Sequence, residues 1–155
     1  MRLGELIQGL AIQDFEGNPE ADIRGIAYDS RKVTRGDLFF ALPGEKTDGA
    51  KFAAQAVANG AAAVVGERDV ARFADLTYIR LDDSRQALTW LAAAFYDWPG
   101  RKLTVIGVTG TDGKTTTTNL LYQILRTAGL KAGMVSTVNA VIGDEVLDTG
   151  FHVTT

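Results

Sequence analysis

The sequence contains no cysteine and a single histidine, His152, among its 155 residues. The absence of cysteine excludes a disulfide framework, thiolate catalysis and cysteine-ligated metals, and one histidine cannot form a histidine metal cluster. No apolar run approaches the roughly 20 residues that a membrane-spanning helix needs. The first residues also lack the charged segment and apolar core of a secretory signal. We therefore expect a cytoplasmic protein without membrane insertion.

Strong charge of either sign is also missing. The chain has 16 Lys and Arg against 19 Asp and Glu, for a net charge of -3, so there is no basic field to attract nucleic acid. The hydrophobic share of 46% and the charged share of 23% are ordinary for a globular protein. The length corresponds to one large domain or two small ones, and we expect a monomer.

Strand-like and helix-like segments alternate in the first part of the chain. Helical spacing or caps predict helices at 3–10, 52–60, 70–73 and 83–98, and short apolar runs predict strands at 23–28, 38–42, 61–65 and 77–81. Asp83 is the expected N-cap of the last helix, with Gln86 three residues on. Residues 14–19 have the composition of a polar loop. The alternation predicts an α/β layer, and Pro99-Gly100 is the best candidate domain boundary.

After this boundary the pattern restarts. Residues 103–108 are predicted to form a buried parallel strand, 131–136 a second strand, and 138–141 with 146–147 a hairpin. The helix between them, 114–128, is expected to end at Gly129 and to bury its apolar residues, namely Leu120, Leu121, Ile124, Leu125 and Ala128. Because these elements do not complete a doubly wound sheet, we expect residues 1–155 to be the front of a longer protein.

The junction between the predicted strand 103–108 and the following helix carries the clearest chemical signal. Gly110 and Gly113 permit a backbone whose N–H groups converge on a phosphate, Lys114 supplies a positive charge, and Thr115 offers a hydroxyl to magnesium. The helix N-terminus adds its dipole. The standard pattern G-x-x-x-x-G-K-[ST] is incomplete, since Val108 stands five residues before Gly113. The alternative explanation is a tight strand-to-helix turn with an exposed lysine.

The variant T-G-T-D-G-K-T-T resembles the ATP loop of the Mur ligases, the enzymes that build the peptide stem of peptidoglycan, in which the loop runs T-G-[ST]-[ND]-G-K-[ST]. The resemblance implies that ATP and Mg²⁺ bind here, with Lys114 as the catalytic residue and Thr115 as the metal ligand. The implied nucleotide-binding residues are Gly110, Thr111, Asp112, Gly113, Lys114, Thr115 and Thr116.

Two further stretches resemble the same family. Residues 28–49 match a D-S-R-x-V-x-x-G-D-L-F signature followed by a glycine-bounded loop, which in the family holds the uridine diphosphate end of the substrate. The resemblance implies that Tyr28 and Ser30 line the uracil site and that the loop residues contact the nucleotide, namely Glu45, Lys46 and Thr47. Taken alone, D-S-R is only a turn-forming tripeptide.

The second of these stretches runs from Ser136-Thr137-Val138-Asn139 to Thr154-Thr155 and resembles the family's S-T-x-x-N segment and the start of its T-T-P element. It implies that Thr154 and Thr155 lie beside the muramoyl-peptide part of the substrate. The proline of that element would be the next residue and is not in this chain. The alternative for the two threonines is an ordinary β-rich pair.

The resemblance implies an α/β fold class with a small N-terminal UDP-binding domain at 1–98. The first, truncated part of a mainly parallel-sheet, phosphate-loop ATP-binding domain would follow at 99–155. The family member most resembled adds a diamino acid to UDP-N-acetylmuramoyl-L-alanyl-D-glutamate through an acyl phosphate, with ATP consumed. The alternatives are the member that adds the terminal dipeptide and a nucleotide-binding module without chemistry, and an unrelated phosphate-loop kinase or GTPase is disfavoured. We expect this stretch alone to bind nucleotide without ligating, and the sequence does not identify the diamino acid.

Overall fold

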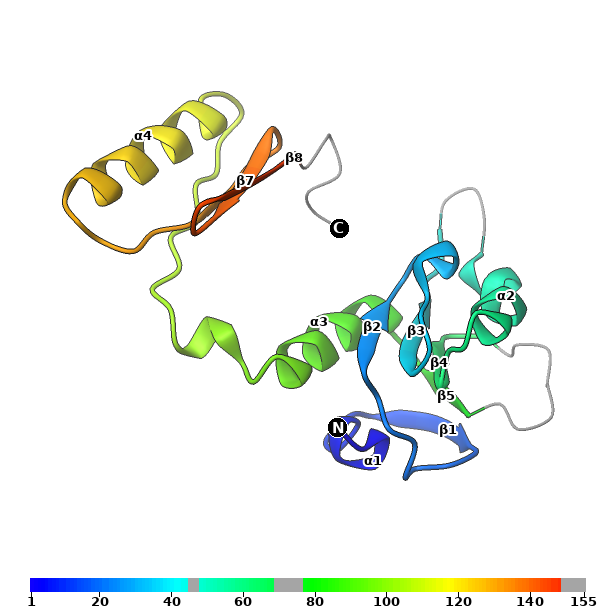
Figure 1. Ribbon diagram of the computed structural model, residues 1–155. Helices are drawn as coiled ribbons and strands as arrows, with labels where there is room; N and C mark the ends of the chain where they lie inside the picture. The colour runs from blue at the N-terminus through cyan, green and yellow to red at the C-terminus, as the bar shows by residue number, and fades with distance from the viewer. Residues whose placement is uncertain (45–47, 69–76, 149–155) are drawn as a thin grey trace. The chain divides into compact units, whose positions relative to one another are not determined.

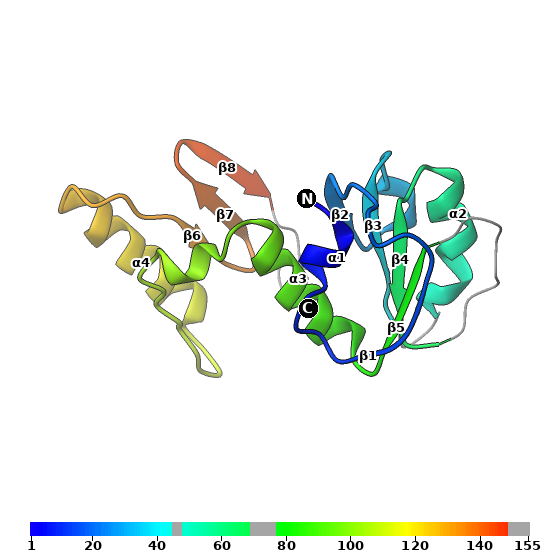
Figure 2. The ribbon, with the colours of Figure 1, turned by 90° about the horizontal axis from the view of Figure 1, so that it is seen from below.

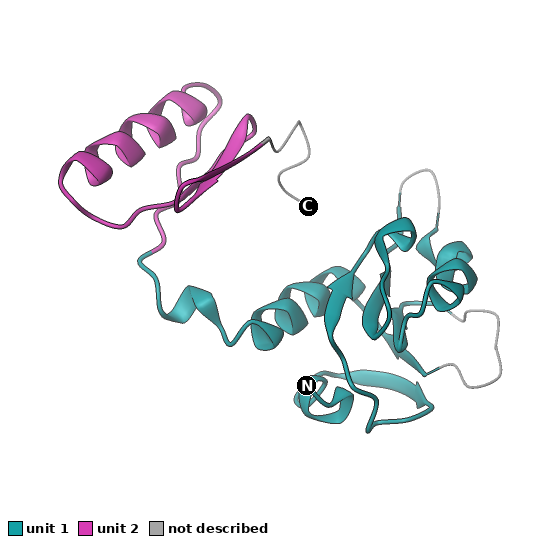
Figure 3. Ribbon diagram, in the orientation of Figure 1, with its two compact units in different colours: residues 1–104 teal, residues 105–155 magenta. Residues whose placement is uncertain are grey.

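A computed structural model describes residues 1–44, 48–68 and 77–148 of the chain. The chain divides into two compact units, Met1–Thr104 and Val105–Thr155 (Figures 1 and 3). The predicted short helix at 70–73 lies outside the described residues.

Unit 1 is an α/β layer, as predicted. Its described strands form one sheet in the order β1-β5-β4-β3-β2, with β2 to β5 parallel and β1 antiparallel to β5 (Figure 1). The strands are β1 Ile12–Glu16, β2 Gly25–Ala27, β3 Asp37–Ala41, β4 Ala63–Gly66 and β5 Tyr78–Leu81. The helices are α1 Leu3–Leu6, α2 Ala53–Ala58 and α3 Ser84–Phe95, with 3₁₀ turns η1 Ser30–Lys32, η2 Gly49–Phe52 and η3 Pro99–Arg101.

The sheet of unit 1 is covered on both faces. Helices α1 and α3 lie on one face of the sheet and α2 lies on the other (Figures 1 and 2). Leu38 and Phe40 of β3 pack with α1 and α3, and Phe39 packs with α2. All of β3 is buried, which explains why its sequence is a continuous apolar run after Asp37 rather than an alternating one. Burial from both sides gives this unit a closed hydrophobic core.

Strand β1 was not predicted. It falls on the segment interpreted as a polar loop, and its burial alternates only weakly because Gln13, Asp14 and Glu16 are exposed. The strand lies at the sheet edge, where pairing with β5 stabilises it and the Gln13 amide donates to Asp82 Oδ2 at 2.8 Å. An edge strand with one partner can carry polar residues that a central strand cannot.

The ends of the helices follow the predicted chemistry. Asp83 caps α3, its Oδ1 accepting from the backbone N–H groups of Arg85 and Gln86 at 3.0 and 2.9 Å, which satisfies two of the free N–H groups of the first turn. Gly129 follows α4 (Lys114–Thr127) at a φ of 80° and donates to the Arg126 carbonyl. The predicted N-cap of α3 and the predicted glycine stop of α4 are both confirmed.

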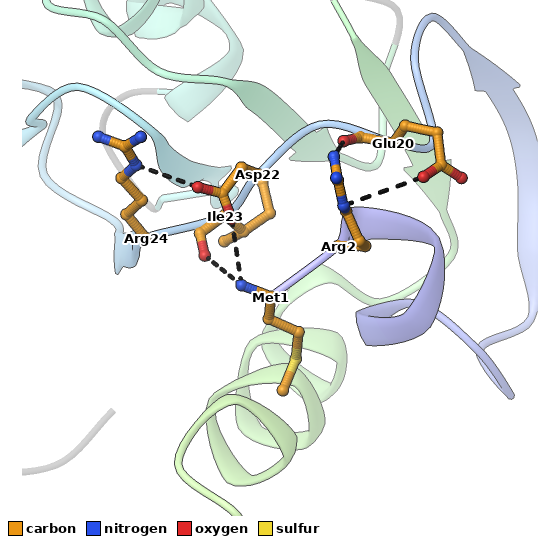
Figure 4. A network of polar contacts seen from close by, with 6 residues as sticks. All are labelled: Met1, Arg2, Glu20, Asp22, Ile23 and Arg24. Carbon is orange, nitrogen blue, oxygen red and sulfur yellow. Dashed lines mark hydrogen bonds and ion pairs between the residues drawn. The ribbon is translucent and has the colours of Figure 1, made fainter.

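A surface network fastens the first residues of the chain to the segment before β2 (Figure 4). The Met1 ammonium donates to Asp22 Oδ1 at 3.3 Å, and Arg24 Nε pairs with the other carboxyl oxygen at 3.2 Å. The hydrogen bond from Arg24 is the main reason that the pKa of Asp22 lies below its ordinary value. Arg2 reaches the Glu20 carbonyl at 2.6 Å. These contacts hold α1 in place on the core that it covers.

The predicted boundary Pro99-Gly100 lies inside unit 1, which extends to Thr104. The Trp98 ring meets Trp90 edge to face at 4.6 Å between centroids, and the Arg101 guanidinium lies 4.1 Å above it. Asp97 pairs with Lys102. The side chains of Arg101 and Lys102 therefore contact the residues that directly follow α3.

The described part of unit 2, residues 105–148, contains one helix and a small antiparallel sheet. Helix α4 is followed by β6 Met134–Val135, β7 Asn139–Ile142 and β8 Glu145–Asp148, and the described strands pair in the order β6-β7-β8. The predicted hairpin is confirmed, with Gly143 in its turn at a φ of 63°.

Two predictions for this part of the chain are wrong. Residues 103–108 form no strand in the described structure, and Leu103, Val105 and Ile106 are exposed. The apolar residues of α4 are not buried either: Leu120 is 60% exposed and Ile124 is 56% exposed. The physical reason is the same for both, because the described strands of unit 2 pair only with one another and provide no sheet face that covers these side chains.

Candidate phosphate and nucleotide sites

The loop before α4 has the backbone of an anion site. Gly113 is the N-cap residue of α4 with φ 76° and ψ -2°, a left-handed conformation that favours glycine. In the described part of the chain no side chain caps this helix. The first-turn N–H groups therefore keep their hydrogen-bonding capacity for a ligand, at the end where the helix dipole is positive.

The Lys114 side chain is held against this loop by two backbone carbonyls of the loop. Its ammonium donates to the carbonyl of Gly110 at 2.5 Å and to that of Thr111 at 2.9 Å. An ammonium has three donors, so beyond these two described contacts one remains for a ligand. The structure thus brings together four of the predicted residues: Gly110, Thr111, Gly113 and Lys114. Asp112 and Thr116 lie in the same segment with exposed side chains.

Thr115 lies where the helix and the small sheet meet. Its Oγ1 is 3.5 Å from Oγ1 of Thr137, and the Asn119 amide donates to its backbone carbonyl at 2.8 Å. Two hydroxyl oxygens side by side are hard donors of the type that Mg²⁺ accepts, usually together with phosphate oxygens and waters. The residues present therefore fit a magnesium ion shared with a phosphate. In the described residues no cluster of three or more His, Asp or Glu competes for that role.

Thr137 was not among the predicted site residues. Its position is set by a compact turn in which the Ser136 hydroxyl donates to the Asn139 carbonyl at 3.0 Å and accepts from the Asn139 N–H at 3.2 Å. The S-T-x-x-N stretch contained the signal, because its serine and asparagine form the turn and its threonine is the residue presented. The other predicted threonines, Thr154 and Thr155, lie outside the described residues.

The D-S-R stretch in unit 1 is a self-fastened 3₁₀ turn. Asp29 caps η1 by accepting from the Arg31 N–H at 3.1 Å, and the Arg31 guanidinium donates to both carboxyl oxygens, at 2.9 and 2.7 Å. This hydrogen-bonded pairing lowers the pKa of Asp29 from 3.8 to about 2. The two charged residues of the signature thus shape the turn, and the residue between them is turned inward.

Ser30, the residue between them, is only 6% exposed. Its hydroxyl donates to Oε1 of Gln55 on α2 at 2.7 Å, and the Asn59 amide donates to its backbone carbonyl at 2.8 Å. Tyr28, two residues earlier, is 64% exposed. The two predicted uracil residues therefore differ in kind, one a free aromatic surface and one a fixed, buried hydroxyl.

The remaining signature residues are also explained by local structure. Asp37 accepts from the N–H and the hydroxyl of Thr34 at 2.8 and 3.1 Å. Asp48 caps η2 and pairs with Arg68 at 2.9 Å. A Cβ at Gly49 would lie 2.5 Å from the Leu42 carbonyl oxygen, so only glycine fits there. These contacts frame the loop whose predicted ligand residues, Glu45, Lys46 and Thr47, lie outside the described residues.

Comparison with known proteins agrees with this arrangement. The family model described as Mur ligase family, catalytic domain, matches residues 22–96, and the model described as Mur ligase middle domain matches residues 108–155. The first match includes the D-S-R turn and the Asp37 and Asp48 caps. The second includes the phosphate loop and the Ser136–Asn139 turn.

Individual relatives point the same way. A UDP-N-acetylmuramoyl-L-alanyl-D-glutamate--2,6-diaminopimelate ligase of Caldanaerobacter subterraneus is 44% identical over 96% of this chain, which spans 31% of that relative. A solved structure of a ligase of the same name matches all of this chain and 31% of its own, at a TM-score of 0.70 and 26% identity.

A MurF ligase from Thermotoga maritima, solved in complex with ADP, matches 67% of this chain and 23% of its own, at a TM-score of 0.55 and 34% identity. This chain thus spans about a third or less of the length of each of these relatives. With both family models placed end to end on the two units, the chain belongs to the Mur ligase family.

Proposed function

We propose that this chain is the nucleotide-handling part of an ATP-dependent ligase of peptidoglycan precursor synthesis. Unit 1 would bind the uridine diphosphate end of UDP-N-acetylmuramoyl-L-alanyl-D-glutamate, and unit 2 would bind ATP. A diamino acid would be the incoming amine. The observation that carries the proposal is the loop before α4, where an uncapped helix N-terminus and the Lys114 ammonium converge. The names of the relatives supply the substrate class.

The proposed chemistry is activation of a carboxylate, which is a poor electrophile, by transfer of the γ-phosphoryl group to give an acyl phosphate. The amine then attacks the acyl carbon, and phosphate and ADP are released. Lys114 and the loop N–H groups would stabilise charge on the transferring phosphoryl group. Thr115 would hold Mg²⁺, with Thr137 adjacent. The ion would supply positive charge that offsets the negative charge of the phosphates.

The ADP bound to the Thermotoga maritima ligase supports a nucleotide site in this family. That protein is a MurF ligase, and its likeness keeps open a second function, addition of the terminal dipeptide. The relatives that match 96% and 100% of this chain favour the diamino acid. Among the described residues no helix is long and apolar enough to span a membrane, and we propose a cytoplasmic monomer.

ATP binding to the chain tests the proposal. Lys114→Ala should weaken ATP·Mg²⁺ binding at least about tenfold, since a lost charge-assisted contact is worth about 1.5 to 3 kcal/mol. UDP binding should not change, because Lys114 belongs to the other unit. Lys131→Ala, another exposed lysine of unit 2, is the matched control and should bind ATP normally. Calorimetry that finds equal ATP affinity for both variants would remove the phosphate loop from the proposed function.

A further inference from the structure

The hydrogen bonds between Ser30 and α2 have defined donors and acceptors. Gln55 of α2 and Asn59, the C-cap residue of that helix, are four residues apart, and their amides bind the same residue in opposite senses. The Gln55 amide oxygen accepts from the Ser30 hydroxyl, and the Asn59 amide nitrogen donates to the Ser30 carbonyl. Both the side chain and the backbone of Ser30 are therefore fixed from α2.

A serine hydroxyl carries one proton and two acceptor lone pairs. At 2.7 Å from Gln55 Oε1 the single proton of Ser30 is committed. What Ser30 can still offer to a ligand is its lone pairs, so it can accept a hydrogen bond but cannot donate one. Gln55 itself is exposed, so this assignment depends on a side chain outside the hydrophobic core.

We infer that Gln55 makes Ser30 an obligate hydrogen-bond acceptor and so selects uracil over cytosine in the bound nucleotide. Uracil presents an N3–H donor, and cytosine presents an N3 acceptor at the same position. If Ser30 can only accept, it gains a hydrogen bond from uracil N3–H. Facing cytosine, its lone pair would instead oppose the lone pair of N3 and no hydrogen bond would form. The inference rests on the proposed uridine nucleotide function and adds to it a positioning residue that acts through Ser30.

The test compares the affinities of UDP and CDP for the whole 155-residue chain by calorimetry. We expect the parent to prefer UDP at least about tenfold, the effect of one hydrogen bond gained against one left unmade. Gln55→Met cannot accept the proton, so the hydroxyl turns freely and can donate to cytosine, and the preference should fall to about threefold or less. Gln55→Glu can still only accept and should retain the parental preference.

Asn59→Ala is the matched control, because it removes the contact to the backbone carbonyl and leaves the hydroxyl with Gln55. It should weaken UDP and CDP alike and leave their ratio unchanged. A merely structural role of Gln55 would give the same result for Gln55→Met, and that outcome would overturn the inference. Loss of the UDP preference in Gln55→Glu would also overturn it. Failure of the parent to bind UDP at all would instead reject the proposed uridine site, and the inference with it.

Discussion

The two units use similar apolar residues with opposite results. In unit 1, Phe40 and Leu91 lie in a sheet-and-helix core with no exposed surface. In unit 2, the equally apolar Leu120 and Ile124 lie on a regular helix and stay more than half exposed. The difference is the number of partners: β3 has a strand on each side and helices over both faces, and α4 has only a small antiparallel sheet. Burial thus depends on what surrounds an apolar residue as much as on its type.

The largest expected effect comes from the core of unit 1. Phe40→Ala should lower the free energy of unfolding by about 3 to 5 kcal/mol, because the ring is fully buried and leaves a cavity. Ile124→Ala should change it by about 0.5 kcal/mol or less, because an exposed side chain has little packing to lose and alanine favours helix.

Urea unfolding followed by circular dichroism measures both variants. Tryptophan fluorescence then isolates unit 1, since Trp90 and Trp98, the two tryptophans of the chain, lie there. A loss of stability in Ile124→Ala as large as that in Phe40→Ala would show that the apolar face of α4 is covered, and the contrast between the units would collapse.

A smaller and more local effect concerns the D-S-R turn at Asp29 to Arg31. The hydrogen bonds from Arg31 hold the pKa of Asp29 at about 2, below its ordinary 3.8. A pKa that is lowered in the folded state stabilises the fold at pH values above the ordinary pKa. This contribution is lost as the pH falls from 3.8 toward 2. At about pH 3 the carboxyl should therefore remain mostly ionised. The Arg31→Gln variant should instead be mostly protonated there.

Nuclear magnetic resonance of the Asp29 carboxyl and of the Arg31 amide, which donates to it, follows this titration. Equal midpoints in the parent and in Arg31→Gln would mean that the ion pair does not fasten the turn. The D-S-R turn would then resemble the loop before α4, which contains no ion pair between side chains in the described part of the chain and is held by contacts of Lys114 with backbone carbonyls.

Much of unit 1 could be predicted from the sequence because its signals are local. The continuous run at Leu38–Leu42 and the cap at Asp83 each specify an element by themselves. Strand β1 could not be predicted in this way, since its polar residues form a strand only by pairing with β5, far along the chain. The strand predicted at 103–108 is wrong for the converse reason. Apolar β-branched residues favour a strand, but they do not supply the neighbouring strand with which it must pair.

The candidate sites divide in a similar way. The turn before α4 was predictable because the left-handed Gly113 and the contacts of Lys114 depend on backbone geometry that the sequence encodes within a few residues. The contact between Ser30 and Gln55 could not be predicted, since 25 residues separate them and only the packing of α2 brings them together. Thr137 was missed for the same reason, because its distance from Thr115 depends on the fold of the small sheet.

The central claim is that the two units hold separate nucleotide sites, and hydrogen exchange with bound ligand tests it most directly. The account predicts that UDP slows amide exchange in the segment from Tyr28 to Asn59 and leaves Gly110 to Thr117 unchanged. ATP with Mg²⁺ should do the reverse. Protection of the phosphate loop by UDP, or of the Ser30 turn by ATP, would contradict the assignment of one nucleotide to each unit.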